Sequence, residues 1–407
     1  MQNNNETVCV IGLGYIGLPT AALLACKGYN VCGVDINSAT VDTINSGGIH
    51  IVEPALDLYV KEAVASGALK AYLQPQMADI YIICVPTPFY PNQESPTPNL
   101  EYVVKAIESL TNLIKPGDMV ILESTSPVGT TAKLSQILTE NGIDVEKISI
   151  AYCPERVLPG KIMSELISND RIVGGLSQIS TQKVAEFYET FVDGAVLKCS
   201  AKTAEMCKLA ENSFRDVNIA FANELSMVCD THGIDPWQLI SLANHHPRVN
   251  ILQPGTGVGG HCIAVDPWFI VSGDPEHSKI IKLARQVNDS KPAWVVNKIM
   301  GKVDDLVKQG IENPVVACLG LAFKPDIDDL RESPAVIVVE RLLQLGIDIR
   351  VVEPHIAHHT TFRLTSLDDA LEADLVVLLV KHSAFHDDEM RARLGSKNVL
   401  DFCGSLV

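Results

Sequence analysis

Short runs of apolar residues alternate with longer amphipathic stretches over the first half of the chain. Five of these runs predict buried strands, at residues 8–11, 30–34, 80–85, 119–122 and 148–151. The segments 18–27 and 102–113 have the composition and periodicity of helices. Fully apolar strands that alternate with helices are typical of a parallel sheet covered on both faces. We therefore predict an α/β fold for this part.

The pattern changes near residue 200. Helical periodicity without strand signals extends over 203–232 and again over 278–309, with a loop-rich segment between them. A second α/β pattern then begins, with a helix at 334–345 and four short strands, at residues 315–319, 348–352, 375–380 and 399–401. We predict two Rossmann-like parallel-sheet domains joined by a central helical region, with domain ranges 1–199, 200–310 and 311–407.

Charge and cysteine usage narrow the class of protein. A formal net charge of -17 argues against nucleic acid or an anionic membrane as a partner. The 11 cysteines are scattered and form no Cys-x-x-Cys pair, as in a reduced cytoplasmic protein without structural zinc. The N-terminus has no signal-peptide pattern, and no apolar run approaches the ~20 residues of a membrane span. These features together predict a cytoplasmic protein. The histidines lack metal-ligand spacing, so we expect no bound metal.

A dinucleotide-binding fingerprint follows the first predicted strand. Gly12, Gly14 and Gly17 have the spacing G-x-G-x-x-G, and a predicted helix begins directly after them. Such glycines permit a tight turn and a close approach of a pyrophosphate to the helix N-terminus. Asp35 ends the second predicted strand, where a carboxylate binds the ribose hydroxyls of NAD and repels the 2′-phosphate of NADP. The alternative is an ordinary strand–helix turn in another parallel sheet.

A second candidate site surrounds Cys262. This cysteine ends a glycine-rich segment, 255–260, and Asp266 follows it by four residues. Glycine lets the backbone approach a ligand closely, and a thiolate is a good nucleophile toward an aldehyde. The alternative is a buried structural cysteine in a tight turn.

A third candidate site lies on the predicted helix 203–232. Lys208, Asn212 and Arg215 fall on one stripe of that helix. They either bind an anionic or oxygen-rich ligand or form a solvated polar face, which the spacing alone does not decide. Further basic side chains in loops are candidates for a diphosphate site, although each alone is ordinary surface charge: Arg156, His246, Arg248, Lys324 and Arg331.

Four motifs together identify a family. They are GLGYIGLP at 12–19, ESTSPVGT at 123–130, KLAEN at 208–212 and GGHC at 259–262. With them the chain resembles the UDP-glucose/GDP-mannose dehydrogenase family from end to end. Three further stretches resemble its members that oxidise UDP-N-acetyl-D-mannosamine: 151–160, 205–225 and 246–250.

The resemblance implies a four-electron oxidation of a C6 alcohol to a carboxylate with two NAD⁺. The product would be UDP-N-acetyl-D-mannosaminuronate, a precursor of enterobacterial common antigen or capsule polysaccharides. Cys262 would capture the C6 aldehyde as a thiohemiacetal, and a second oxidation would leave a thioester that water hydrolyses. The first domain would then bind NAD, the central one would carry the cysteine loop and a long connecting helix, and the last would bind the UDP-sugar.

The resemblance also implies residue roles. Lys208 would act as general acid/base and stabilise the C6 oxyanion with Asn212, Asp266 would orient or activate a water, and Glu155 would be a candidate base. The implied NAD contacts are Gly12, Gly14, Tyr15, Ile16, Gly17, Asp35, Thr87, Thr125 and Arg331. The implied sugar-nucleotide contacts are Arg156, Val157, Lys208, Asn212, Arg215, His246, Arg248, Gly259, Phe323 and Lys324. Some contacts in this family come from the neighbouring subunit, which implies a homodimer joined through the helical region.

Three alternatives remain. A relative acting on UDP-N-acetylglucosamine, UDP-N-acetylgalactosamine or UDP-glucose would use the same thiol chemistry with a different sugar pocket. A β-hydroxyacid dehydrogenase would need neither Cys262 nor a second sheet domain. A non-catalytic NAD-binding module gives no reason for a thiol, a lysine and an asparagine together.

Overall fold

A computed structural model describes residues 6–90, 96–260 and 262–406. The chain divides into two compact units, Met1–Glu211 with Trp268–Gly273, and Asn212–Pro267 with Asp274–Val407. The three domain ranges expected from the sequence stay a prediction. Within the described ranges, no helix is long and apolar enough to cross a membrane.

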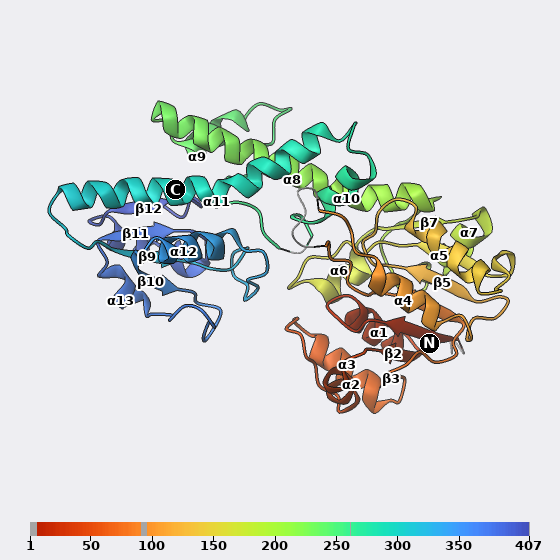
Figure 1. Ribbon diagram of the computed structural model, residues 1–407. Coiled ribbons are helices and arrows are strands. Elements are labelled where there is room, and N and C mark those ends of the chain that lie inside the picture. Colours follow the sequence, from red (N-terminus) through yellow and green to blue (C-terminus); the bar gives the residue numbers. More distant parts are fainter. Residues whose placement is uncertain (1–5, 91–95, 261, 407) are drawn as a thin grey trace. The chain divides into compact units, whose positions relative to one another are not determined.

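An eight-stranded sheet forms the centre of the first unit (Figure 1). Its strands, in spatial order, are β3 (Leu69–Tyr72), β2 (Asn30–Val34), β1 (Thr7–Ile11), β4 (Ile80–Ile83), β5 (Met119–Leu122), β6 (Ser149–Tyr152), β7 (Arg171–Gly175) and β8 (Val196–Ser200). Neighbouring strands are parallel except β6 and β7, which are antiparallel. The strand order reverses between β1 and β4, and α/β sheets bind ligands at such a switch point, beyond the carboxyl ends of the strands.

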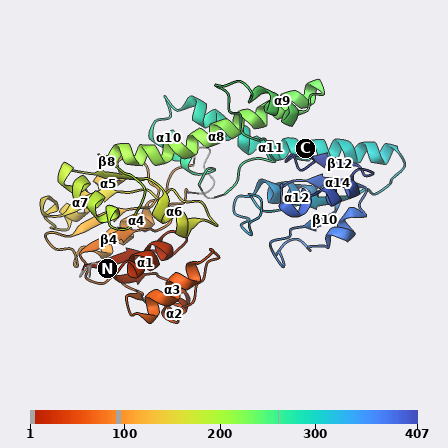
Figure 2. The ribbon, with the colours of Figure 1, turned by 180° about the vertical axis from the view of Figure 1, so that it is seen from behind.

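Helices cover both faces of this sheet. They are α1 (Gly17–Cys26), α2 (Ser38–Asn45), α3 (Leu56–Ala65), α4 (Glu101–Ser109), α5 (Thr130–Glu140), α6 (Ile162–Ser168) and α7 (Gln178–Glu189), with a 3₁₀ turn at Val145–Lys147. Successive residues of β1 face opposite sides: Val8 and Val10 belong to one apolar cluster, Cys9 and Ile11 to another. The helices α1, α3 and α6, visible from behind in Figure 2, contribute side chains to the cluster that contains Val8 and Val10. The alternation explains why the strands are apolar throughout.

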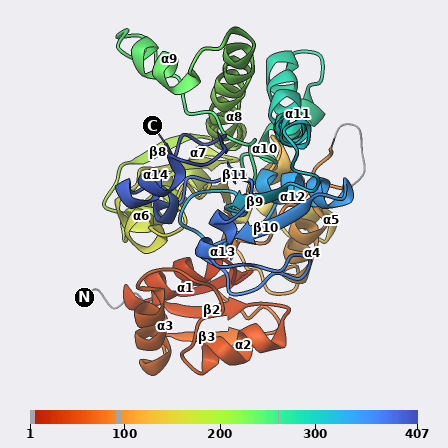
Figure 3. The ribbon, with the colours of Figure 1, turned by 90° about the vertical axis from the view of Figure 1, so that its left-hand side faces the viewer.

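The second unit contains a four-stranded parallel sheet of order β10-β9-β11-β12. Its strands are β10 (Asp348–Val352), β9 (Val315–Leu319), β11 (Leu375–Leu378) and β12 (Val399–Asp401). The remaining helices of the chain are α8 (Ala201–His232), α9 (Pro236–Ala243), α10 (Asp266–Gly273), α11 (Lys279–Lys308), α12 (Pro334–Gln344), α13 (Leu367–Leu371) and α14 (Asp388–Leu394), with a 3₁₀ turn at Ser383–Phe385. The long helix α11 packs on α12 through an apolar cluster that includes Val295, Ile299 and Val338 (Figure 3).

The structure confirms the predicted α/β architecture and corrects its detail. The predicted strands at 30–34, 119–122, 315–319, 348–352 and 399–401 match residue for residue. The sequence analysis did not predict β3, β7 or β8, and the sheet is not parallel throughout. The sequence of β7, RIVGG, contains an arginine and two glycines, and β8 is an edge strand with exposed positions, so neither gives a continuous apolar run.

Candidate active site

The glycine turn after β1 has the geometry that a pyrophosphate requires. Gly12 has a φ of 89°, and a Cβ there would lie 2.8 Å from the carbonyl oxygen of Cys84. A Cβ at Gly17 would clash with the carbonyl of Gly12. By contrast, a Cβ at Gly14 would meet nothing within 4 Å. Packing therefore explains two of the glycines, whereas Gly14 leaves open space in front of the turn, where a ligand can approach the backbone.

Two further contacts border this turn. Asp35, half-buried after β2, accepts hydrogen bonds from the backbone N–H groups of Leu13 (3.1 Å) and Asn37 (2.9 Å). The hydroxyl of Thr87, after β4, donates to the carbonyl of Thr125, after β5, over 2.6 Å. The predicted cofactor residues of the first unit thus lie at the carboxyl ends of β1, β2, β4 and β5. Tyr15 and Ile16 are half-buried within the turn itself.

Glu155, whose side chain is buried, and Lys208 lie next to each other in the same unit. Lys208 donates from Nζ to the backbone carbonyl of Glu155 over 2.8 Å, and the Glu155 side chain accepts the N–H of Val157. Burial raises the pKa of Glu155 to about 7, although Lys208 and Arg171 act in the opposite direction. A carboxyl group whose pKa lies near 7 suits a general base. The structure thus brings together two of the predicted catalytic residues.

Arg156 makes contacts within the protein. Its Nη2 lies 2.7 Å from Glu211 Oε1, its Nε 3.1 Å from Glu211 Oε2, and Nη1 donates to the carbonyl of Asp170. The guanidinium is therefore held in a fixed orientation by a two-point carboxylate contact.

The second unit contains Cys262 and Asp266 of the second candidate site and Asn212 of the third. The carbonyl of Cys262 accepts the N–H of Asp266 over 2.8 Å, so Cys262 begins the turn that leads into α10. Asp266 is 3% exposed, and its Oδ2 accepts a hydrogen bond of 2.5 Å from Asn212 Nδ2. The carboxylate therefore fixes the orientation of the Asn212 amide.

The glycines before Cys262 are required by the protein itself. A Cβ at Gly259 would lie 2.8 Å from Phe323 Cβ, and a Cβ at Gly260 would lie 2.8 Å from the Phe323 ring. Gly260 also donates its N–H to the carbonyl of Arg331 over 3.1 Å. The sequence analysis attributed these glycines to close approach of a ligand, and the structure gives a different reason. The thiol loop and the loop 320–333 pack against each other. His261 lies outside the described residues.

The other predicted contacts of the second unit are scattered over its loops and surface. Arg215, His246 and Arg248 are exposed, and Lys324 is half-buried. Arg331 forms an ion pair with Asp329, with Nη2 and Oδ2 2.5 Å apart. Their roles stay a prediction.

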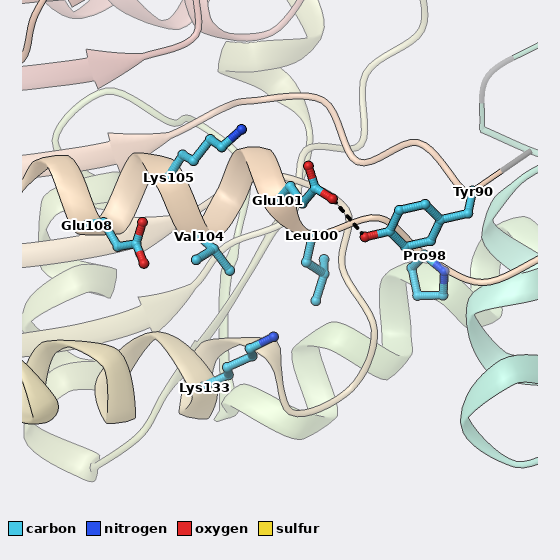
Figure 4. A pocket seen from close by; sticks show the side chains of 8 residues that line it. All are labelled: Tyr90, Pro98, Leu100, Glu101, Val104, Lys105, Glu108 and Lys133. Atoms are coloured by element: carbon cyan, nitrogen blue, oxygen red, sulfur yellow. Dashed lines mark hydrogen bonds between the residues drawn. The ribbon is translucent and has the colours of Figure 1, made fainter.

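A surface pocket of about 330 Å³ lies elsewhere in the first unit, between α4 and α5 (Figure 4). Tyr90, Glu101, Lys105 and Lys133 are among its lining residues, and Tyr90 donates to Glu101 over 3.1 Å. Its lining carries charges of both signs and includes none of the predicted site residues. We therefore assign it no role in the reaction.

Sequence reasoning missed Glu205, which holds the loop that carries Thr125. Glu205 is fully buried on α8 and accepts the N–H groups of Gly129 (2.6 Å) and Thr131 (2.7 Å), together with the Thr131 hydroxyl (2.7 Å). These bonds cap the N-terminus of α5. A signal was present, because Glu205 precedes Lys208 by three residues and Asn212 by seven, on the same helical stripe.

Family models match most of the chain. The NAD binding domain of the UDP-glucose/GDP-mannose dehydrogenase family matches residues 6–192. The central domain of that family matches residues 202–290, and its UDP binding domain matches residues 317–406. The glycine turn lies in the first match and Cys262 in the second.

Individual relatives agree with these matches. A UDP-N-acetyl-D-mannosamine dehydrogenase of Campylobacter jejuni is 52% identical over 99% of this chain and 100% of its own length. An NDP-N-acetyl-D-galactosaminuronic acid dehydrogenase of Ralstonia nicotianae is 51% identical over 98% and 96%. Among solved structures, the UDP-N-acetyl-mannosamine dehydrogenase Cap5O of Staphylococcus aureus has a TM-score of 0.88 at 40% identity, covering 98% of this chain and 95% of that one.

Proposed function

The chain belongs to the UDP-glucose/GDP-mannose dehydrogenase family and is an NAD-dependent sugar-nucleotide dehydrogenase, and we propose that its substrate is UDP-N-acetyl-D-mannosamine. The proposed product is UDP-N-acetyl-D-mannosaminuronate, formed by oxidation at C6. Similarity to the relative of Campylobacter jejuni supports this substrate. We further propose that the reaction takes place in the cytoplasm and supplies a bacterial surface polysaccharide.

The residues of the glycine turn fit the cofactor. Gly14 leaves space for the pyrophosphate, and Asp35 lies where the ribose hydroxyls would be recognised. NAD⁺, when bound there, would supply the hydride acceptor for the two oxidations. The rest of the chemistry falls to side chains of this chain.

We assign the covalent steps to Cys262. Oxidation of the C6 alcohol gives an aldehyde, and the thiol sulfur adds to its carbonyl carbon to form a thiohemiacetal. A second two-electron oxidation gives a thioester, and water then breaks the C–S bond to give the carboxylate and the free thiol. Two NAD⁺ and one water are consumed for each carboxylate formed. A covalent link explains how one site performs both oxidations without releasing the aldehyde.

We assign proton transfer to Lys208 and Glu155. Lys208 takes up the alcohol proton and, with the amide of Asn212, stabilises negative charge on the C6 oxygen. Glu155 then accepts a proton from the attacking water during thioester hydrolysis. Asp266 acts through Asn212, which it orients. One helix, α8, carries both Lys208 and Asn212 one turn apart, on the same stripe.

The observation that carries this proposal is the backbone hydrogen bond that places Cys262 one turn before the buried Asn212–Asp266 pair. A cysteine at this position has a use in aldehyde capture, and neither a single-oxidation dehydrogenase nor a NAD-binding module needs it. For the second candidate substrate class, the 51% identity to the Ralstonia nicotianae relative favours an N-acetylgalactosamine sugar.

An NADH-release assay across a panel of UDP-sugars separates these substrates. The panel holds UDP-N-acetyl-D-mannosamine and the UDP derivatives of N-acetylglucosamine, N-acetylgalactosamine and glucose. We expect kcat/KM for UDP-N-acetyl-D-mannosamine to exceed the others by at least about tenfold, because a sugar pocket built around one orientation of the C2 acetamido group leaves polar groups unpaired with the other three sugars. A preference for another sugar would refute the assigned substrate and retain the reaction class.

We also propose that the enzyme is a homodimer joined through α8. Phe214, Phe221 and Val228 follow each other at seven-residue spacing on this helix and are 69%, 54% and 50% exposed in the single chain. A row of exposed apolar side chains along one helix stripe favours packing against a second copy. The shared-site contacts expected for this family require such a dimer.

Phe221→Asp tests the dimer. A buried charge at the centre of the stripe is expected to weaken self-association roughly 30-fold or more and to reduce turnover at low enzyme concentration. Sedimentation velocity measures the first effect and NADH release the second. Lys202→Asp, at an exposed position of the same helix, is the matched control. A Phe221→Asp protein that sediments as the wild type does would rule out this interface.

A further inference from the structure

A buried acid–histidine pair lies at the carboxyl edge of the second sheet and has no part in the mechanism above. Glu353 follows β10 and is 5% exposed, and His382, in the segment after β11, is fully buried. Glu353 Oε2 lies 3.0 Å from His382 Nε2. A carboxylate and an imidazole withdrawn from water need several hydrogen-bond partners. The hydrogen-bond partners of this pair lie in the backbone on both sides of the segment Phe323–Lys324.

Glu353 binds the backbone that precedes this segment. Its Oε2 accepts the N–H groups of Leu321 (2.7 Å) and Ala322 (3.0 Å), and its Oε1 accepts the N–H of His355 (3.0 Å). The burial of Glu353 raises its pKa, but the His382 contact and these donors outweigh that effect and leave the pKa below its ordinary value. One carboxylate thus fixes the two residues directly before Phe323.

His382 binds the backbone that follows the segment. Its Nδ1 accepts the N–H of Asp326 over 2.9 Å. Because a backbone N–H can only donate, Nδ1 carries the lone pair and Nε2 carries the proton that it donates to Glu353. Asp326 has a φ of 58°, and its Oδ1 accepts the backbone N–H of Ser383 (2.9 Å) and the Ser383 hydroxyl (2.8 Å). A left-handed residue is therefore held by contacts on both its backbone and its side chain.

The same residues have the spacing of a metal site. One ligand atom from each of Asp326, His355 and His382 lies within 4.8 Å of the others. However, His382 Nδ1 and Asp326 Oδ1 are already acceptors in the hydrogen bonds described above. A cation would have to break them and expose the Asp326 N–H. The hydrogen bonds explain the cluster without a metal.

Building on the proposed function, we propose that Glu353 and His382 are positioning residues that hold Phe323 and Lys324 in the conformation that binds the UDP-sugar. The Phe323 side chain lies against Gly259 through its Cβ and against Gly260 through its ring, so the same clamp also supports the loop that carries Cys262. A loop ordered in advance avoids the entropy loss of ordering on binding, which strengthens nucleotide affinity. Neither residue touches the reacting atoms.

Binding of UDP alone tests the clamp without depending on which sugar is oxidised. In His382→Leu, which removes both hydrogen bonds, we expect the Kd for UDP to rise about tenfold, while the Kd for NAD⁺ stays within about twofold. His382→Gln, which can donate to Glu353 and accept from Asp326, is expected to recover much of the affinity. His386→Gln is the matched control, because the side chain of His386 bonds the Ser405 carbonyl (2.8 Å) and takes no part in the clamp around Phe323 and Lys324. Isothermal titration calorimetry measures both ligands, and a thermal melt confirms the fold.

An unchanged Kd for UDP in folded His382→Leu would overturn the proposal, as would an equal loss in His386→Gln. If His382→Leu does not fold, Ser383→Ala takes its place. It removes only the hydroxyl that binds Asp326, and we expect a two- to threefold rise in the Kd for UDP. No rise in that variant would also overturn the proposal. These outcomes are distinct from failure of the proposed function, which would appear as wild-type protein that oxidises no UDP-sugar.

Discussion

Cys262→Ser is expected to lower steady-state NADH formation from UDP-N-acetyl-D-mannosamine by at least about a thousandfold. A serine hydroxyl is a much weaker nucleophile toward the aldehyde, so the second oxidation loses its covalent substrate. The affinity for NAD⁺ is expected to stay within about twofold, because the glycine turn and Asp35 belong to the other compact unit. Stopped-flow absorbance at the NADH band gives the rate, and calorimetry gives the affinity.

Cys26→Ser is the matched control. The Cys26 thiol is half-buried at the end of α1 and donates to the Tyr59 carbonyl over 3.7 Å, a bond that a serine hydroxyl can replace. We expect this variant to turn over at the wild-type rate. Mass spectrometry of trapped wild-type enzyme should locate the substrate on the peptide that contains Cys262. Wild-type turnover in Cys262→Ser would show that no covalent bond to this sulfur is needed.

Apolar patterning predicts five strands of the first sheet and all four strands of the second, and it misses β3, β7 and β8 of the first. The strands β2, β5, β9, β10 and β12 match the sequence prediction residue for residue. The sequence of β8, VLKCS, gives no comparable run because it forms the edge of the sheet. The antiparallel step between β6 and β7 leaves no trace in the sequence, since hydrophobicity reports burial and not strand direction.

The two sheets show why a motif alone does not define a nucleotide site. In each sheet, a glycine with positive φ follows one strand and an acid follows the next strand along the chain. These are Gly12 after β1 and Asp35 after β2, and Gly320 after β9 and Glu353 after β10. Asp35 is half-buried, whereas Glu353 is 5% exposed and is held by His382. Only a structure distinguishes the acid that can face a ribose from the acid that supports its own loop. The partner of Glu353 lies 29 residues away, at no spacing that a motif specifies.

The glycines before Cys262 give a similar lesson. Their density directs attention to the thiol, yet Phe323 contacts both Gly259 and Gly260, and Glu332 and Pro334 also contact Gly259. Phe323 is more than 60 residues further along the chain. A sequence reveals that the backbone must be approached closely at such a position, and it does not reveal what approaches it.

Glu155→Gln is expected to block thioester hydrolysis and so to lower turnover about 10²- to 10⁴-fold. Both oxidations precede hydrolysis, so this variant should release a burst of two NADH per active site and then stop, with a thioester on Cys262 visible by mass spectrometry. Lys208→Ala is expected to show no burst, in contrast to Glu155→Gln, because Lys208 serves the first oxidation. Lys202→Ala, an exposed lysine of the same helix, is the control and should behave as the wild type.

The pH dependence gives an independent test of the same carboxyl group. The pKa of Glu155 lies at about 7 instead of its ordinary 4.5, because burial disfavours the charge. As a base it must be ionised, so hydrolysis in the wild type should fall about tenfold per pH unit below pH 7. The folded state binds the proton more tightly than the unfolded state, so this group's stabilising contribution is complete below pH 4.5 and is lost as the pH rises to about 7. Glu155→Gln should flatten that part of the stability curve, measured by denaturant unfolding. An unchanged curve and an unchanged rate profile would together exclude Glu155 as the base.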